Sequence, residues 1–267
     1  MLGKLFKYEM KATGRVLLPA FAAVLVMGII NGILYMFMPD IDAPNTIYAM
    51  LTIVFTVIMV LATVAVIVMS YVLAIYRFQK NLLGREGYLM NTLPVSTTKN
   101  ILAKLFAAVI YEAIAIIIVI FSYSLFLVFI ASADIGFIEL WRGLWDVVFS
   151  LFAEIPGEGW IYAAELAIMM VVSLAYSNLM FYAAMSMGYS SNSHKAIKSV
   201  GVYVGFYIIN QILSTVLVGS IAITCGDFSG SGSVHVLMIS SIIYELVIAA
   251  AYWSLTWFFM KRKLNLQ

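Results

Sequence analysis

Six long apolar runs constrain this chain more than any other feature of its sequence. A bilayer core requires about 20 consecutive apolar residues in a helix, and each run is long enough. In lipid, backbone N–H and C=O groups must be paired within the segment, so runs of this length fold as helices. None of them alternates between apolar and polar residues, as the strands of a membrane β-barrel do. The predicted spans are residues 16–38, 47–76, 101–131, 160–187, 200–224 and 234–260.

The composition leads to the same fold class, an all-α integral membrane protein with six transmembrane helices. Of the 267 residues, 64% are hydrophobic and 10% are charged, whereas soluble domains carry about 25% charged residues. The spans leave too little chain for a built-in ATPase, kinase or DNA-binding domain, so we expect a single transmembrane domain over residues 1–267. The expected surroundings are a lipid bilayer, with no nucleic-acid partner. The one cysteine, Cys225, cannot form an intramolecular disulfide.

Lys and Arg residues predict the orientation of the spans, because they accumulate in cytoplasmic segments. Arg142 lies on one side of the six-span arrangement, and every other Lys or Arg lies on the opposite side. This asymmetry predicts a multi-pass protein of the cell membrane with both termini in the cytoplasm. The cytoplasmic set is Lys4, Lys7, Lys11, Arg15, Arg77, Lys80, Arg85, Lys99, Lys104, Lys195, Lys198, Lys261, Arg262 and Lys263.

Two further segments have the pattern of amphipathic helices. In residues 2–14, apolar residues and lysines recur on opposite helical faces, which predicts an elbow helix lying in the inner interface. The alternative is a plain basic flank that serves topology only. In residues 136–153, apolar and aromatic residues including two tryptophans recur at three- and four-residue steps. This pattern predicts a helix that rests on the outer leaflet or covers the external mouth of a pathway.

The sequence contains no combination of residues typical of an active site or a metal site. His194 and His235 are predicted on opposite sides of the membrane, so they cannot share a metal ion. Neither a catalytic Ser or Cys with a matching base nor a metal-binding motif is present. We therefore expect no catalytic residue, no bound metal and no cofactor in this chain.

Three glutamates fall within apolar runs, where a charge is costly and often functional. Glu112 is predicted near the cytoplasmic boundary of the third span, and Glu165 near the outer end of the fourth, where it can snorkel. Glu245 is the deepest, near the middle of the sixth span. We interpret Glu245 and Glu112 as pathway candidates. The alternative for Glu245 is a hydrogen bond between helices.

Two GxxxG pairs mark places where helices can approach closely. Gly28 and Gly32 lie in the first span, and Gly201 and Gly205 in the fifth. They are candidates for a dimer interface, and packing within one subunit is an equally good interpretation.

The segment "LLGREGYLMNTLPVSTTKNILAK" differs from the rest of the chain because it is polar and locally structured. Apolar residues form a stripe over residues 82–93, and Pro94 ends any preceding helix. Ser96 or a neighbouring threonine can cap the helix that follows. We interpret residues 80–98 as a short amphipathic helix suited to docking on another protein. The alternative is a solvated connecting loop.

This segment resembles the first cytoplasmic loop of type-2 ABC exporter permeases, especially those of Gram-positive bacteria. The family pattern is a charged residue with Glu and Gly, an apolar helical turn, a Leu–Pro–hydroxyl ending and a basic residue entering the third span. The six spans and the N-terminal elbow agree with the same family. The matching residues are Arg85, Glu86, Gly87, Leu89, Leu93, Pro94, Val95, Ser96 and Lys104.

The resemblance implies a half-transporter that pairs with a second permease subunit, identical or different. Each subunit would bind a separate ABC ATPase, which holds the ATP and Mg²⁺, so the permease itself is not an enzyme. The loop helix would be the coupling helix that docks on the ATPase. In this family spans one and five form the dimer contact, where the glycine pairs fall. The implied docking residues are Arg85, Glu86, Gly87, Tyr88, Leu89, Met90, Leu93 and Pro94.

One feature departs from the family pattern. The family places its large outer element between spans five and six, whereas here it lies between spans three and four.

The aromatic-rich spans, without an acidic or basic cavity, favour an amphipathic or lipid-like substrate over a small ion. Two other functions stay open: an ion-coupled secondary carrier, and a non-transporting scaffold or sensor subunit.

Overall fold

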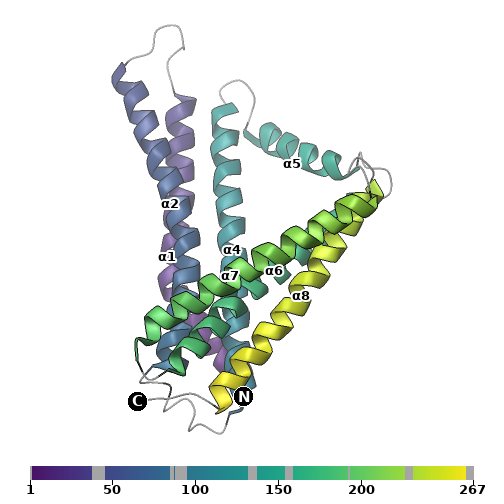
Figure 1. Cartoon of the computed structure of the whole chain (residues 1–267). Helices are drawn as coiled ribbons and strands as arrows, with labels where there is room; N and C mark the ends of the chain where they lie inside the picture. Colours follow the sequence, from purple (N-terminus) through teal and green to yellow (C-terminus); the bar gives the residue numbers. More distant parts are fainter. Residues whose placement is uncertain are drawn as a thin grey trace. The chain divides into compact units, whose positions relative to one another are not determined.

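The computed structural model describes residues 2–37, 46–84, 87, 95–131, 137–153, 159–191, 193–225 and 231–262 (Figure 1). These residues form helices and short connections. The elements are α1 (Leu2–Met36), α2 (Thr46–Phe78), the π-helix η1 (Gln79–Leu83), α4 (Thr97–Ala131), α5 (Phe137–Ala153), α6 (Gly159–Tyr189), α7 (Lys195–Cys225) and α8 (Ser231–Arg262). Within the described residues, α1, α2 with η1, α4, α6, α7 and α8 are each long and apolar enough to cross a membrane. The prediction of an all-α protein with six membrane-spanning helices is confirmed at this level.

The helices are longer than the apolar runs that predict them. α6 has 31 residues, and α2 with η1 continues for 38 residues. At 1.5 Å per residue these lengths correspond to about 47 and about 57 Å, against a hydrocarbon core of about 30 Å. Residues 47–76 and 101–131 are the longest of the predicted spans, but α1, α7 and α8 also exceed 30 residues. Hydropathy marks where a helix leaves lipid, whereas its backbone hydrogen bonds continue into the polar flank.

The two predicted amphipathic segments differ in outcome. Residues 2–14 do not form a separate elbow helix, because α1 runs without interruption from Leu2 to Met36 and includes Pro19. The outer segment forms α5, within one residue of the predicted 136–153. Aromatic rings follow one another along α5, with Trp141 and Trp145 centred 6.0 Å apart. Trp141 also contacts Phe121 of α4, edge to face at 5.4 Å.

The chain divides into two compact units, which are described separately. Unit 1 consists of residues 1–10, 72–109 and 161–267, and unit 2 of residues 11–71 and 110–160. α1, α2 and α4 each contribute residues to both units.

In unit 2, small residues allow α1 to pack closely on α4. An added Cβ at Gly28 would lie 2.7 Å from the carbonyl oxygen of Ser122, and one at Gly32 would lie 2.6 Å from Cβ of Phe129. The Ser122 hydroxyl donates a hydrogen bond to the Val24 carbonyl oxygen at 2.9 Å. The geometry of the first-span glycines therefore supports packing within one subunit.

The second glycine pair is in a different environment. Added Cβ atoms at Gly201 and Gly205 of α7 would meet no atom within 4 Å. The neighbouring Val200 and Val204 are also exposed. This face of α7 is open to lipid or to a partner subunit.

The core of unit 1 lies where α2, η1, α4, α6 and α8 meet. Phe78 and Tyr182 are fully buried there, and their rings stack with centroids 3.9 Å apart. Leu82 of η1 and Ile101 of α4 pack into the same cluster. Because η1 and the start of α4 share this core, the two helix ends that flank residues 85–94 have fixed positions within unit 1.

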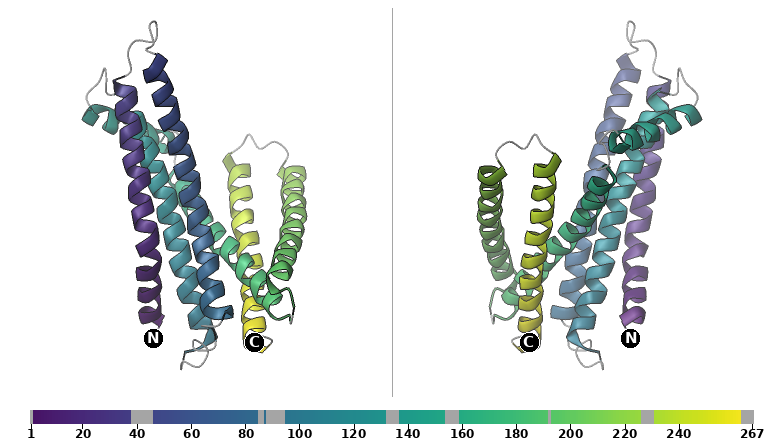
Figure 2. Two further views of the ribbon diagram at one scale, coloured as in Figure 1. Left: turned by 90° about the vertical axis from the view of Figure 1, so that its left-hand side faces the viewer. Right: turned by 90° about the vertical axis from the view of Figure 1, so that its right-hand side faces the viewer.

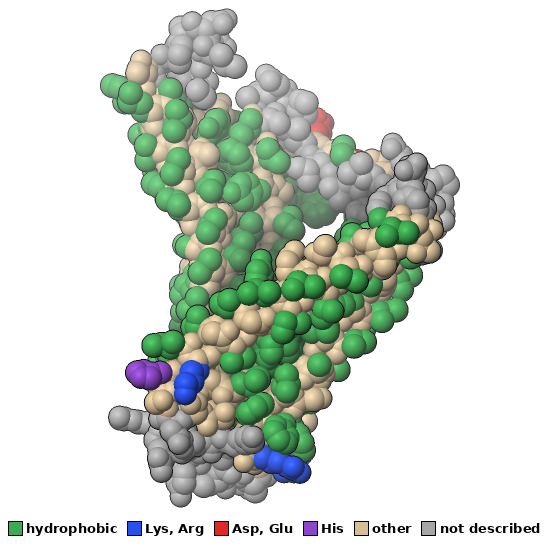
Figure 3. Space-filling view, in the orientation of Figure 1, with side chains coloured by type: hydrophobic (Ala, Val, Ile, Leu, Met, Phe, Trp, Pro, Cys, Tyr) green, Lys and Arg blue, Asp and Glu red, His purple; other side chains and the backbone are tan. Residues whose placement is uncertain are grey.

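The outer surface of unit 1 is divided between apolar and basic regions. Figure 2 shows α7 and α8 side by side. In Figure 3, hydrophobic side chains cover much of the visible face of these two helices, and the visible Lys, Arg and His side chains lie at one end. The basic residues of α7 and α8 there are Lys195, Lys198, Lys261 and Arg262.

A buried ion cluster joins three helices at this basic end of unit 1. Glu9 of α1 accepts contacts from Nη2 of Arg77 at 2.8 Å and from Nζ of Lys104 at 2.7 Å. Lys104 is only 4% exposed. Removing charges from water costs several kcal/mol per ion, so a buried charge is tolerated only with close, well-placed partners. In the sequence, Arg77 and Lys104 were interpreted as topology signals, and Glu9 was not identified.

We predict that Glu9→Gln strongly destabilises the protein, because Lys104 then stays buried with less compensating charge. The expected cost is about 3–5 kcal/mol, measured as thermal unfolding of the purified protein in mild detergent. The double variant Glu9→Gln, Lys104→Met should regain part of the loss. Lys99→Met, at an exposed position on the same helix, is the matched control and should be neutral. A Glu9→Gln protein as stable as wild type would contradict this role.

The glycine packing gives a second prediction. Gly32→Ala should lower the unfolding free energy by about 1–3 kcal/mol, because the added methyl group must separate α1 from α4. Gly205→Ala is the matched control. It meets open space and should be neutral or slightly stabilising, since Ala favours helix over Gly. Equal effects of the two substitutions on thermal stability would contradict the packing described.

Candidate functional site

The residues predicted to dock on an ATPase lie almost entirely outside the described residues. Arg85, Glu86, Tyr88, Leu89, Met90, Leu93 and Pro94 belong to that group. Gly87 is described, and its N–H donates a hydrogen bond to the Gly84 carbonyl oxygen at 2.9 Å.

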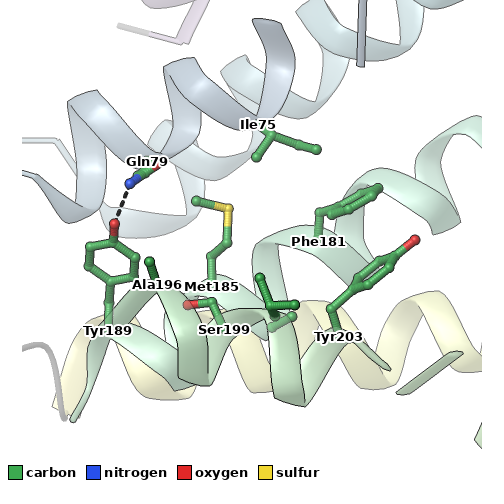
Figure 4. Close-up of a pocket in the computed structure, with 10 residues that line it drawn as sticks. Ile75, Gln79, Phe181, Met185, Tyr189, Ala196, Ser199 and Tyr203 are labelled. Carbon is green, nitrogen blue, oxygen red and sulfur yellow. Dashed lines mark hydrogen bonds between the residues drawn. The ribbon is translucent and has the colours of Figure 1, made fainter. Parts of the chain in front are cut away.

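The flank on the α2 side is a π-helical turn. The Gly84 N–H donates to the carbonyl oxygen of Gln79 at 2.8 Å, a bond across five residues. π-Turns are rare and are found mostly as single turns, often at functional sites. Gln79 lies in this turn, and its side-chain amide donates a hydrogen bond to the Tyr189 hydroxyl of α6 (Figure 4).

A cavity of about 240 Å³ lies beside this hydrogen bond. It lies between α2 with η1 on one side and α6 and α7 on the other, as Figure 4 shows. The rings of Phe181 and Tyr203 stack there with centroids 4.3 Å apart. The lining is almost wholly apolar, and Ser199 supplies one hydroxyl group. The cavity can hold an apolar group but offers few polar atoms to orient a ligand.

Further along α6, α7 and α8, unit 1 contains a connected polar network. Asn210 of α7 is 8% exposed. Its amide nitrogen donates to the Tyr252 hydroxyl, and its side-chain oxygen accepts from the Tyr244 hydroxyl at 3.3 Å. Buried polar groups in a low-dielectric interior require such partners. The network joins α7 to α8.

Glu245 follows Tyr244 on α8 and contacts α6. The Ser173 hydroxyl lies 2.8 and 2.7 Å from the two carboxyl oxygens and donates to one of them at a time. The hydrogen bond between helices that the sequence left open as an alternative is therefore present. It does not exclude a pathway role, because Glu245 also lines a cavity.

This second cavity, here named the Glu245 cavity, has a volume of about 290 Å³. Tyrosines from α6, α7 and α8 surround it together with amide, hydroxyl and carboxyl groups. From the sequence, the aromatic-rich spans were described as lacking an acidic or basic cavity. The structure differs, because residues from three helices converge on a cavity that Glu245 lines. The lining residues are Tyr176, Met180, Tyr203, Tyr207, Asn210, Gln211, Ser214, Tyr244 and Glu245.

The other two intramembrane glutamates lie in different surroundings. Glu112 is 2% exposed on α4 and belongs to unit 2. Glu165 lies 2.9 Å from Nδ1 of His235, and the His235 ring stacks on Tyr162 with centroids 4.0 Å apart. The sequence suggested that Glu165 can snorkel, and in the structure it is paired with His235. Among the residues that the structure describes, no three His, Cys, Asp or Glu form a group that could hold a metal ion.

Glu245 was identified from the sequence, but the residues around it were not. One signal was present, because Tyr203, Tyr207, Asn210 and Ser214 recur at four-, three- and four-residue steps and so share one face of α7. Ser173 carries no comparable signal, since single serines are common in membrane helices.

Comparison with known proteins gave no relative: no family model matches the chain, and neither the curated proteins nor the solved structures contain a match.

Proposed function

We propose that this chain is the membrane subunit of an ATP-driven exporter of the cell membrane. It has both termini in the cytoplasm, pairs with a second permease subunit and binds separate ATPase subunits through residues 85–94. ATP and Mg²⁺ bind to the ATPase and not to this chain. The observation that carries the proposal is the Arg85–Pro94 sequence pattern at the junction between α2 with η1, the longest spanning element described, and α4.

The basic end of unit 1 supports the proposed orientation. Lys and Arg accumulate in cytoplasmic segments. The start of α7 and the end of α8 lie at one end of these neighbouring helices and carry Lys195, Lys198, Lys261 and Arg262. The ends of α2 and α4 that flank the docking segment are joined in the same unit by the Glu9 ion cluster.

The packing of these helix ends suits the transmission of force. A docked ATPase can move a transporter only if the loop it grips is stiffly connected to the spans. Glu9 joins α2 to α4 through Arg77 and Lys104, and Phe78 and Ile101 pack in one core. Because close-packed interiors transmit strain, a displacement of residues 85–94 would carry α2 and α4 together.

The dimer contact is proposed on α7. Gly28 and Gly32 already pack against α4 in the same chain, whereas Gly201 and Gly205 meet open space. A second permease subunit could therefore approach α7 closely without displacing any described part of this chain.

An ion-coupled carrier is less well supported. Such carriers bind their ions where membrane helices are broken near the bilayer midplane. The six spanning helices are continuous over their described lengths, and the π-turn of η1 lies at the end of α2.

The docking segment gives a direct test. We predict that an ATPase co-purifies with the tagged chain from its native membrane in mild detergent, identified by mass spectrometry. The double variant Glu86→Arg, Leu93→Asp should retain at most about one tenth of it, because a buried apolar contact and a polar anchor are both lost. Lys261→Glu, at an exposed position outside the segment, should retain the partner.

Two results would contradict this proposal. If the intact wild-type chain yields no ATPase in repeated preparations, the exporter function is wrong and a scaffold or carrier role takes its place. Retention of the ATPase by the double variant would instead place docking elsewhere on the chain.

The orientation has its own test in intact cells. In a Cys225→Ser background, a cysteine at Gly143 should react with a membrane-impermeant maleimide, because α5 is proposed outside. A cysteine at Lys198 should react only after the cells are permeabilised. Both positions are exposed, so a difference reports sidedness and not burial. The reverse labelling pattern would invert the proposed topology.

A further inference from the structure

We propose that the Glu245 cavity binds the head group of an organic ammonium cation. This inference concerns binding by the chain alone, and it rests on the proposed function only in making that cation the exported cargo. The charge of the cavity, its aromatic lining and its size each support this inference.

Glu245 differs from two other glutamates of unit 1 in its partners. Glu9 is paired with Arg77 and Lys104, and Glu165 with His235. The contacts described for Glu245 are hydrogen bonds from Ser173, and no ion pair to a Lys, Arg or His is described for it. A carboxylate in a membrane-spanning helix is strongly stabilised by an opposite charge. A cation in the adjoining cavity would supply that charge.

The lining favours an organic cation over a metal ion. Tyr176, Tyr203, Tyr207 and Tyr244 reach the cavity from three helices. The faces of aromatic rings attract ammonium groups, and cages of such rings recognise quaternary ammonium ligands that have no N–H to donate. Ca²⁺ takes six to eight oxygen ligands, usually including several carboxylates, whereas the cavity offers one carboxylate.

The size of the cavity fits a small head group. An apolar cavity of about 150 Å³ accommodates benzene, so the Glu245 cavity, at about 290 Å³, can take a group of roughly twice that volume. Tyr207 at its edge is 57% exposed on a helix whose outer face is apolar. An alkyl or aryl tail could therefore extend from the cavity along α7 into lipid.

The test uses benzyltrimethylammonium, a permanent cation of suitable size. Binding of the tritiated compound to the purified full-length chain in nanodiscs is measured by scintillation proximity, with empty nanodiscs as the blank. Neopentylbenzene has the same shape with carbon in place of the charged nitrogen. We expect saturable binding that the unlabelled cation displaces and the neutral compound does not.

Matched variants assign the binding to the cavity. Glu245→Gln keeps the size of the side chain and a hydrogen-bond acceptor for Ser173, and it should weaken binding at least about tenfold, because a charge partner is lost. Tyr176→Phe should stay within about twofold of wild type, and Tyr176→Leu should bind several times more weakly, because only the ring is needed for the cation–π contact. Glu165 lies on the same helix as Tyr176 but does not line the cavity. The Glu165→Gln variant should therefore bind the cation with the affinity of the wild type. Each variant is compared at equal melting temperature and elution volume.

The outcomes separate this inference from the exporter function. The absence of saturable binding, equal displacement by neopentylbenzene, or wild-type affinity in Glu245→Gln would each overturn the inference. The assay contains no ATPase, so these results do not depend on whether an ATPase docks on residues 85–94. Conversely, failure to co-purify an ATPase would refute the exporter and leave the cation site standing.

Discussion

The structure depends on one constraint, the pairing of backbone hydrogen bonds in a medium that supplies no water. This constraint makes every membrane-crossing segment a helix, and it leaves side chains to decide how the helices associate. Lipid is as apolar as leucine, so apolar side chains give the helices little preference for one another over lipid. Close packing at glycines and bonds between polar side chains then become the specific contacts. Gly28 and Gly32 against α4 are of the first kind, and the Asn210 network is of the second.

The polar contacts of unit 1 form two groups of different character on different helices. At the basic end, Glu9 joins three helices through a charged cluster with 2.7–2.9 Å contacts. Within the spans, Asn210 and Ser173 make neutral or singly charged contacts beside an open cavity. A fully paired cluster resists rearrangement because breaking it leaves a buried charge. A carboxyl group with one hydroxyl partner beside a cavity retains acceptor capacity for a ligand. The paired cluster lies on α1, α2 and α4, whereas the cavity lies on α6, α7 and α8, so rigidity and the proposed binding belong to different helices of unit 1.

The sequence predicted the spans and α5 because both depend on local pattern, namely the length of an apolar run and the spacing of aromatic residues. It did not predict the continuity of α1 through residue 15, because a change of side-chain polarity leaves helical backbone bonds intact. The partners of Glu9 could not be predicted, since Arg77 and Lys104 are distant in sequence and resemble ordinary topology charges. The role of Gly28 differs from that of Gly201 only through the neighbouring helix, which one sequence does not specify. Tyr203, Tyr207 and Asn210 carried a periodic signal that aromatic residues in a membrane helix easily obscure.

The π-turn of η1 has a mechanical consequence. A π-turn contains one residue more than an α-turn, so returning residues 79–83 to α-helical bonding would shift the following chain by one position. One residue of α-helix corresponds to a rotation of about 100° and a rise of about 1.5 Å. Such a change would leave the helix intact and would alter the direction in which the chain leaves it. The side-chain hydrogen bond from Gln79 to the Tyr189 hydroxyl stabilises the observed π-helical register.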